Sequence, residues 1–220
     1  MNILVTGAAG FLGRRLIEAL LLRGALTDRQ GATQSISKIV AFDVVPLNGL
    51  DDPRVEVVCG DIADPQVLET LVTADVDSIF HLAAVVSSQA EQDFELGMRI
   101  NFIATQQLLE RIRKIGSCPK WVMTSSVAVF GGQLPAQVED HHVWAPQSSY
   151  GTQKAMNDLL LADYSRRGFV DGRSLRMPTI VVRPGKPNLA ASSFASGIIR
   201  EPLNGQESVC PVPLDTRLWL

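Results

Sequence analysis

Short, continuous apolar segments alternate with segments of helical periodicity along most of this 220-residue chain. In the first expected helix, Phe11, Leu12, Leu16, Ala19 and Leu20 recur at helical spacing. Strands that are apolar on nearly every residue are buried on both faces, as in a parallel sheet covered by helices. The sequence therefore predicts an α/β fold built on a doubly wound parallel sheet. We expect strands over residues 2–5, 38–45, 55–61, 77–84, 120–126 and 174–184, and helices over residues 11–23, 64–72, 90–115, 149–167 and 192–200.

The charge and the apolar segments argue against several kinds of partner. A net charge of -3 gives no reason to expect nucleic acid or an anionic membrane. The longest apolar run, near residues 16–22, is interrupted by Glu18 and is too short to span a bilayer. The first residues have neither the basic lead nor the cleavage site of a secretory signal. We therefore expect a cytoplasmic protein.

The sequence contains three cysteines, Cys59, Cys118 and Cys210. They are odd in number and far apart, and their spacing matches no metal-binding pattern. We expect buried free thiols in a reducing compartment, and we expect no metal site.

A glycine-rich segment follows the first expected strand and begins the first expected helix. Its sequence, TGAAGFLG, contains Gly7, Gly10 and Gly13. Gly7 permits a tight turn, Gly10 lets backbone N–H groups approach a pyrophosphate, and Gly13 lets the helix pack closely on the sheet. The spacing is G-x-x-G-x-x-G, whereas the usual fingerprint is G-x-G-x-x-G, but the strand–turn–helix context favours dinucleotide binding on a Rossmann-type fold. The predicted cofactor site here consists of Gly7, Gly10, Phe11, Leu12 and Gly13.

Asp43 ends the second expected strand, where a carboxylate can accept hydrogen bonds from both ribose hydroxyls of the adenosine half. It would also repel a 2′-phosphate, so it favours NAD over NADP. The polar segment over residues 24–37, expected as a loop, accounts for the long distance from the glycines. Two alternatives are open: Asp43 could cap a turn, and Arg14 or Arg15 could accept a phosphate. Asp61 and Ile62 follow the third strand and are predicted to lie beside the adenine, with a strand-end cap as the alternative for Asp61.

The segment SSYGTQK places Tyr150 and Lys154 four residues apart at the start of an expected helix, and therefore on one face. The Lys154 ammonium, together with a positive nicotinamide ring, is expected to lower the pKa of Tyr150 from about 10. Such a phenol can take a proton from an alcohol as hydride leaves the same carbon. Ser125 and Ser126 end the strand over residues 120–126 and supply a nearby hydroxyl. An exposed helical pair is the alternative, but the glycine segment and the serines favour the catalytic interpretation.

Together these motifs resemble the extended short-chain dehydrogenase/reductase family, also described as NAD-dependent epimerases and dehydratases. The resemblance lies in TGAAGFLG, Asp43, GDI at 60–62, HLAA at 81–84, NFIATQQLLE at 101–110, TSSVAVFG at 124–131, YGTQK at 150–154 and VVRPG at 181–185. It implies that Tyr150 is the general acid or base, that Lys154 binds the ribose and modulates the pKa, and that Ser126 holds the reacting oxygen. It also implies cofactor contacts from Leu82, Ala83, Ala84, Ser125, Pro184 and Gly185, and from Asn101 as a helix position outside the catalytic set.

Within that family the chain is similar to a branch that oxidises the C2 hydroxyl of a four-carbon sugar acid, such as D-erythronate, to the 2-oxo acid. This similarity lies in HLAAVVSSQAEQDFELGMRIN and VVRPGKPNLAASSFASGIIREPLNGQ. It implies NAD as the cofactor and a small sugar acid as the substrate. We also expect that a homodimer would form through the helices over residues 90–115 and 149–167.

The resemblance divides the chain into an NAD-binding domain, residues 1–185, that includes the Ser/Tyr/Lys set, and residues 186–220, where a substrate-binding region begins. Family members continue well beyond this length, so we expect a truncated chain with an incomplete substrate region. Arg217 is expected to bind the substrate carboxylate bidentately, with a surface ion pair to Asp215 or another acid as the alternative. The predicted substrate contacts are Ser87, Ser88, Ser126, Lys186, Asn188, Ser192 and Arg217.

Two other functions are open on the sequence. The first is a sugar-nucleotide epimerase or dehydratase of the same fold. Dehydratases of the family carry an Asp-Glu pair after the strand-end hydroxyl, whereas this chain has Val127 and Ala128, which argues against dehydration only. The second is a non-catalytic dinucleotide sensor. Such proteins tend to lose the Tyr or the Lys, and both are present here.

Overall fold

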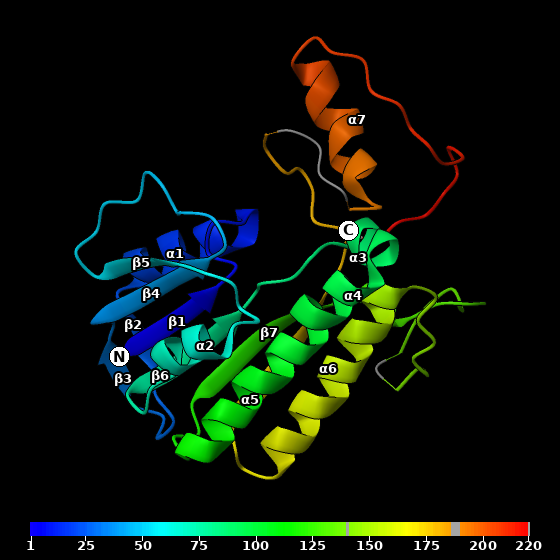
Figure 1. Cartoon of the computed structure of the whole chain (residues 1–220). Helices are drawn as coiled ribbons and strands as arrows, with labels where there is room; N and C mark the ends of the chain where they lie inside the picture. The colour runs from blue at the N-terminus through cyan, green and yellow to red at the C-terminus, as the bar shows by residue number, and fades with distance from the viewer. Residues whose placement is uncertain (140, 186–189, 220) are drawn as a thin grey trace.

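The computed structural model describes residues 1–139, 141–185 and 190–219. Its centre is a six-stranded parallel sheet in the order β5-β4-β1-β6-β7-β8 (Figure 1). The strand order reverses between β1 and β6, so the carboxyl ends of these strands border a crevice. The predicted fold class, an α/β fold with a doubly wound parallel sheet, is confirmed. The strands are β1 (Asn2–Thr6), β4 (Lys38–Asp43), β5 (Val55–Cys59), β6 (Val76–His81), β7 (Lys120–Ser126) and β8 (Asp171–Met177).

Both faces of β1 are buried, which explains its continuous apolar run. Ile3 and Val5 belong to the core cluster shared with α1, whereas Leu4 belongs to the opposite cluster, shared with α2, α5 and α6. Successive strand residues point to opposite faces, so a strand with helices on both sides needs apolar residues at every position. Figure 1 shows α5 and α6 side by side over the sheet. These helices are α1 (Phe11–Arg23), α2 (Pro65–Leu71), α5 (Ala104–Ile115) and α6 (Ser149–Arg166).

The single helix expected over residues 90–115 is broken at Asp93, so that prediction is wrong. Asp93 has φ -129° and ψ 88°, outside the helical region, and its carboxylate accepts a hydrogen bond from the amide of Leu96 at 2.9 Å. The side chain therefore caps a new helix start, which a continuous helix would not allow. The segments are α3 (Ser87–Gln92), α4 (Phe94–Gly97), a π-helix η1 (Met98–Ile103) and then α5.

The segment over residues 24–37 contains a hairpin, so the expectation of a loop is wrong there. Strands β2 (Ala25–Thr27) and β3 (Thr33–Ser35) pair antiparallel. The Asp28 carboxylate accepts hydrogen bonds from the amides of Gln30 and Ala32, both at 2.9 Å. These bonds close the turn that joins two strands of only three residues each, ALT and TQS, which are too short to show an alternating apolar pattern.

The last strand is shorter than the predicted range of residues 174–184. Strand β8 ends at Met177, because Pro178 has no N–H to donate to the ladder. Beyond it, the predicted short helix is present as α7 (Ser193–Leu203). Figure 1 shows α7 standing apart from the sheet, on the side of α3.

The prediction of buried thiols is wrong. Cys59 is exposed, and Cys118 and Cys210 are half-buried. Cys59 ends β5, which is an edge strand of the sheet, so no further strand covers it. Within the described residues, no three or more His, Cys, Asp or Glu side chains are grouped so that they could hold a metal ion. No helix of the described ranges is long and apolar enough to cross a bilayer.

Candidate active site

A large cleft lies at the carboxyl ends of β1, β6, β7 and β8. Its volume is about 1420 Å³. The wall on the β1 side is the glycine segment, and the floor is the end of β7 with the start of α6. The opposite wall comes from α3 and from the chain after β8, which returns past α7 toward α3 (Figure 1). The predicted residues that line this one cleft are Gly7, Gly10, Phe11, Leu12, Gly13, Leu82, Ala84, Ser87, Ser88, Ser125, Ser126, Tyr150, Lys154, Ser192 and Arg217.

The glycine segment leaves room for an anion at the start of α1. Gly7 has φ +73°, and a Cβ on it would lie 2.7 Å from the amide nitrogen of Ala83. A Cβ on Gly13 would lie 2.1 Å from the carbonyl oxygen of Gly7. Gly10 is the N-cap of α1 and provides no side-chain hydrogen bond, so within the described structure no capping side chain occupies the first helical N–H groups. Such a helix start is suited to bind a pyrophosphate.

Asp43 ties the glycine segment to the end of β4. The amide of Ala9 donates to Oδ2 of Asp43 at 2.9 Å, and the amide of Val44 donates to Oδ1 at 2.7 Å. The carboxylate is half-buried and keeps acceptor capacity for the ribose hydroxyls. The turn-capping alternative is thus observed, and the ribose contact of Asp43 stays a prediction.

Several predicted cofactor residues do not line the cleft itself. Asp61 forms an ion pair with Arg99 at 2.5 Å, and this hydrogen bond lowers the pKa of Asp61. Ile62 is buried in the core. Pro184 and Gly185 are exposed. The roles assigned to these residues stay predictions. The cleft lining does not include Asp43, Asp61, Ile62, Ala83, Asn101, Pro184 or Gly185, and Lys186 and Asn188 lie outside the described residues.

Tyr150 and Ser126 are hydrogen-bonded to each other at the floor of the cleft. Ser126 caps the short 3-10 helix η2 (Val127–Val129), and its Oγ accepts a hydrogen bond from the amide of Ala128 at 3.1 Å. Its single hydroxyl hydrogen is therefore free to point at the phenol. Tyr150 sits in the first turn of α6, whose N-cap Ser148 accepts a hydrogen bond from the amide of Gly151. The two hydroxyls are thus fixed by the start of two helices.

Lys154 lies beneath Tyr150, as the spacing predicted. Its ammonium is 5.6 Å from the centre of the Tyr150 ring and donates to the carbonyl oxygen of Thr124 at 2.7 Å. Burial lowers the pKa of Lys154 to about 8, and Asp158 acts in the opposite direction. The group therefore stays charged at neutral pH, which a ribose ligand and a modulator of the phenol both need.

The expected lowering of the Tyr150 pKa is not seen in the chain itself. Burial raises the pKa of Tyr150, and the hydrogen bond from Ser126 opposes this shift. Desolvation penalises the phenolate more than the hydroxyl donor favours it. The expectation counted Lys154 and the nicotinamide ring of a bound cofactor, but it did not count the desolvation of the phenol by burial.

Ser125 also fits a bound group at this edge of the sheet. Its side chain is 2% exposed and lines the cleft. Among the described residues its Oγ has no hydrogen-bond partner. A buried hydroxyl is normally paired, so an unpaired one beside a cleft is suited to receive a hydrogen bond from a ligand.

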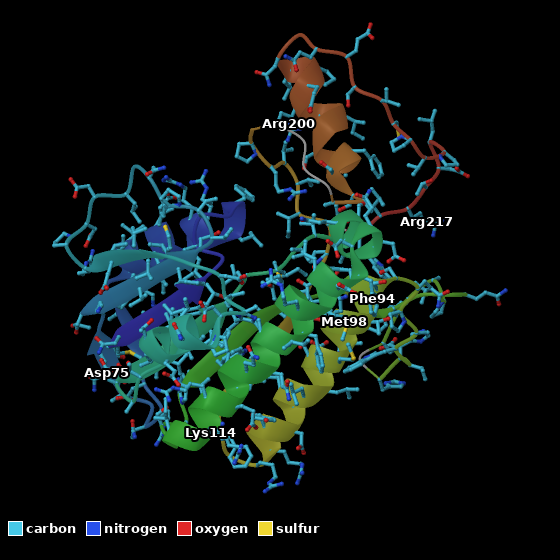
Figure 2. The ribbon with its side chains drawn as sticks, viewed as in Figure 1. Asp75, Phe94, Met98, Lys114, Arg200 and Arg217 are labelled. Carbon is cyan, nitrogen blue, oxygen red and sulfur yellow. The ribbon has the colours of Figure 1, made fainter. Side chains whose placement is uncertain are left out.

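The predicted substrate residues that the structure describes come from both sides of the cleft. The amide of Ala191 donates to Oγ of Ser87 at 3.0 Å, which joins α3 to the chain before α7. Ser192 follows directly and lines the cleft with Ser88. Arg217 is exposed on the returning tail (Figure 2) and, within the described residues, forms no ion pair with Asp215.

Three cleft groups were missed on the sequence. Arg183 lines the cleft and is half-buried, and burial lowers its pKa. Glu91 accepts a hydrogen bond from the amide of Ser149 at 2.8 Å, so α3 holds the start of α6. The carbonyl oxygen of Thr124 fixes Lys154. Only Arg183 had a signal, the charge inside VVRPG, whereas the other two depend on backbone groups.

Comparison with known proteins gives one consistent assignment. The family model described as "Epimerase: NAD dependent epimerase/dehydratase family" matches residues 3–217. The chain is 60% identical over 220 residues to a protein of Cupriavidus necator and 49% identical over 221 residues to one of Haemophilus influenzae, both named D-erythronate dehydrogenase. Each match covers 100% of this chain and 68% of the relative.

Solved structures agree with this assignment. The structure titled "The crystal structure of the nucleoside-diphosphate-sugar epimerase from Agrobacterium tumefaciens" has a TM-score of 0.88 at 48% identity, over 97% of this chain and 63% of that one. MoeE5 in complex with UDP-glucuronic acid and NAD has a TM-score of 0.74 at 29% identity, over 93% of this chain and 62% of that one. The chain thus spans about two thirds of the length of these relatives. The predicted family is confirmed: the chain belongs to the NAD dependent epimerase/dehydratase family.

Proposed function

We propose that this chain carries the NAD-binding and catalytic part of a dehydrogenase that oxidises the C2 hydroxyl of a small sugar acid, such as D-erythronate, to the 2-oxo acid. The observation that carries the proposal is the hydrogen-bonded pair of Tyr150 and Ser126, in a cleft that also contains the glycine segment. Two relatives of high identity are named D-erythronate dehydrogenase, and the family is NAD dependent. NAD is accordingly the cofactor.

Ser126, Tyr150 and Lys154 have different roles in the proposed oxidation. Ser126 donates a hydrogen bond to the substrate oxygen, and Tyr150 as phenolate takes the hydroxyl proton of the alcohol. Lys154 stabilises that phenolate and binds the ribose hydroxyls of the cofactor. When bound, the nicotinamide supplies the acceptor for the hydride that leaves the same carbon. The alcohol thus loses one hydride and one proton, and a carbonyl group forms.

The cofactor would extend from the glycine segment to the floor of the cleft. The start of α1 would hold the pyrophosphate, and Asp43 would accept from the ribose hydroxyls of the adenosine half. We assign residues 1–185 to the NAD-binding domain and residues 186–220 to the beginning of a substrate-binding region. Besides Ser126, the described candidates for substrate contacts are Ser87, Ser88, Ser192 and Arg217.

A homodimer through the helices beside the active site stays a prediction. Phe94 of α4 is 60% exposed, and Leu159 of α6 is 62% exposed. Figure 2 shows Phe94 and Met98 near one another, from α4 and η1. Exposed apolar side chains on these elements are compatible with such an interface.

An epimerase acting on a sugar nucleotide is the second candidate. It is favoured by the Agrobacterium structure, which carries that title at 48% identity. The two functions differ in cofactor turnover. An epimerase returns its hydride to the same sugar, so it accumulates no reduced NAD, whereas a dehydrogenase releases one reduced NAD for each acid oxidised.

The test is a panel of four- and five-carbon aldonates with NAD, with UDP-sugars in parallel, followed by the absorbance of reduced cofactor. We expect reduced NAD with an aldonate and none with the UDP-sugars. Isomer conversion of a UDP-sugar without net reduction would instead support the epimerase. NAD binding without any turnover would support a sensor.

Cofactor choice is tested in the same preparation. Because Asp43 would repel a 2′-phosphate, NAD is expected to bind at least about tenfold more tightly than NADP, or about 1.4 kcal/mol. Calorimetric titration of both cofactors measures the ratio. Equal or tighter binding of NADP would contradict the role of Asp43.

A further inference from the structure

His81 is a buried titratable side chain that the proposed reaction does not use. It ends β6, is 5% exposed and does not line the cleft. Its Nδ1 lies 2.8 Å from Oγ1 of Thr6, and its Nε2 lies 2.9 Å from Oγ1 of Thr105. Both threonines are fully buried. The imidazole therefore joins the end of β1 to α5 through two hydroxyls that have no access to solvent.

The neighbouring hydrogen bonds determine which ring nitrogen carries the proton. Oγ1 of Thr105 lies 3.0 Å from the carbonyl oxygen of Asn101, and a carbonyl can only accept, so the Thr105 hydroxyl is the donor there. Because the only hydroxyl hydrogen of Thr105 is used in this bond, its Oγ1 must accept a hydrogen bond from Nε2–H of His81. The neutral ring then presents a bare Nδ1, which accepts from the Thr6 hydroxyl. All four groups are satisfied by only one arrangement of protons.

One end of this chain of bonds holds the cleft wall beside the glycine segment. The amide of Ala83 donates to Oγ1 of Thr6 at 3.3 Å, and the amide of Leu82 donates to the carbonyl oxygen of Thr6 at 3.0 Å. Thr6 directly precedes Gly7, and the space a Cβ on Gly7 would need is already taken by the backbone of Leu82 and Ala83. A small displacement of this backbone would therefore disturb the turn of Gly7.

At its other end the series of hydrogen bonds reaches Asn101, which also holds the wall at Val85 and contacts helix α6. Asn101 accepts from the amide of Val85 at 2.8 Å and donates to its carbonyl oxygen at 3.2 Å. It also donates to Oε1 of Gln153 at 2.8 Å, and its own carbonyl oxygen accepts from Asn157 at 2.6 Å. Gln153 and Asn157 flank Lys154 on α6. The same series of buried hydrogen bonds therefore holds residues 82–85 at two points, at Ala83 through Thr6 and at Val85 through Asn101.

We propose that His81 is a positioning residue: a neutral imidazole protonated on Nε2, which orders a hydrogen-bonded chain from Ala83 through Thr6, Thr105 and Asn101 to α6 and thereby holds the NAD-facing wall of the cleft. The proposal rests on the proposed function only in that NAD is the ligand of this wall. If the proton moved to Nδ1, the Thr6 hydroxyl would lose its acceptor and the Thr105 hydroxyl would lose its donor. The hydrogen bonds of His81 on both sides of the ring therefore depend on each other.

The first test is the tautomer in the unmodified full chain. Long-range proton–nitrogen NMR of the histidine rings distinguishes a protonated Nε2 from a protonated Nδ1. The expected result is a neutral ring with the proton on Nε2 at neutral pH. A proton on Nδ1, or a doubly protonated ring, would overturn the proposal, whether or not NAD binds.

The second test asks whether a change at one end is felt at the other. Thr105→Val removes the hydroxyl with little change of shape, and Thr105→Ser restores it. Among the described residues no hydrogen bond joins Thr105 directly to Ala83, yet Thr105→Val should speed amide hydrogen exchange of Ala83 and weaken NAD binding, each by about tenfold, the low end for one lost buried hydrogen bond. Thr105→Ser should stay within about twofold of the unmodified chain.

Ile112→Val is the matched control for loss of stability, because Ile112 is fully buried on the same helix α5 but outside the chain of hydrogen bonds. It should lower the thermal midpoint without a specific effect on Ala83 or on NAD affinity. If Ile112→Val and Thr105→Val speed amide exchange of Ala83 equally, the effect comes from general loss of core packing and not from the hydrogen bonds of His81. That result would refute the proposal. If the unmodified chain failed to bind NAD, the proposed function would fail, while the tautomer and the exchange rates would still decide this inference.

Discussion

The glycine segment and the chain after β8 form opposite walls of one cleft, but they are held in different ways. Around Gly7 and Gly13 the backbone is so close that a single added Cβ would lie within 2.1–2.7 Å of other backbone atoms. After β8, Leu203 is 82% exposed and Leu214 is 98% exposed. That tail is joined to α3 by the hydrogen bond from the amide of Ala191 to Oγ of Ser87 at 3.0 Å, whereas the bond from the amide of Thr179 to the carbonyl of Trp219 at 2.8 Å lies within the tail itself.

The difference shows where a sequence motif can define a site. A segment packed between a strand and a helix has one arrangement, so its residue types predict its position. A segment with few buried contacts takes its position from whatever it touches. The cofactor wall should therefore be sensitive to very small changes, and the substrate wall should tolerate large ones. The following predictions test this contrast, beginning with the largest effect.

Tyr150→Phe removes one hydroxyl from the rigid floor of the cleft. Turnover should fall by roughly two to four orders of magnitude, the range for loss of a general base, with NAD affinity nearly unchanged. Tyr164→Phe on the same helix is the control, because the Tyr164 hydroxyl is bonded to Glu110 away from the cleft and should not affect turnover. Steady-state rates with an aldonate measure both. Near-normal rates in Tyr150→Phe would remove the phenol from the mechanism.

Gly13→Ala adds one methyl group to the rigid wall. The new Cβ would collide with the carbonyl oxygen of Gly7, so the start of α1 must move and NAD affinity should fall by about a hundredfold or more. Gly197→Ala makes the same change in α7, where the nearest atoms are flexible side chains, the first being Oγ of Ser208 at 3.2 Å. It should be neutral or raise stability by up to about 1 kcal/mol. If titration showed that Gly13→Ala and Gly197→Ala change the NAD affinity equally, the proposed difference between the two walls of the cleft would be wrong.

Lys154→Met should stabilise the fold while it weakens NAD binding and turnover. Burial lowers the pKa of Lys154 from 10.5 to about 8, so the unfolded chain binds this proton more tightly than the folded chain does. The charged lysine therefore costs stability below about pH 8, and the cost is relieved as pH rises toward 10.5. After allowing for the lost bond to Thr124, we expect the variant to gain about 1–2 kcal/mol at pH 7 and less at higher pH.

Urea unfolding at pH 7 and at about pH 9.5 measures this gain. Lys114→Met is the control, because Lys114 is exposed near the end of α5 (Figure 2) and should change little at either pH. A loss of stability at pH 7 in Lys154→Met would show that the buried ammonium is better compensated than its surroundings indicate.

Arg217→Ala tests the loosely held wall and should have the smallest effect. If Arg217 binds the substrate carboxylate, KM for the acid should rise about fivefold to tenfold while NAD affinity stays constant, since an exposed charged hydrogen bond is worth less than the usual ~1.5–3 kcal/mol. Arg183→Ala, on the half-buried arginine of the same cleft, provides the comparison. An unchanged KM in Arg217→Ala with a raised KM in Arg183→Ala would move the carboxylate anchor to Arg183.

The sequence by itself determined the parallel sheet, the glycine segment and the pairing of Tyr150 with Lys154. Each depends on local chemistry: continuous apolar strands need cover on both faces, glycines permit close approach, and residues four apart share a helix face. The limits of α1 and the end of α6 near Gly168 follow from the same local rules.

Only the tertiary structure decided how the cleft is held together. Glu91 binds the start of α6, and His81 links β1 to α5, both through contacts between segments distant in sequence. Likewise Pro184 and Gly185 match a family motif, yet they are exposed and are not part of the cleft lining, which includes their neighbour Arg183. Side-chain type can be read locally, but the partner of a buried polar group is set by packing, because burial without a partner costs about 1–3 kcal/mol and the fold must supply one.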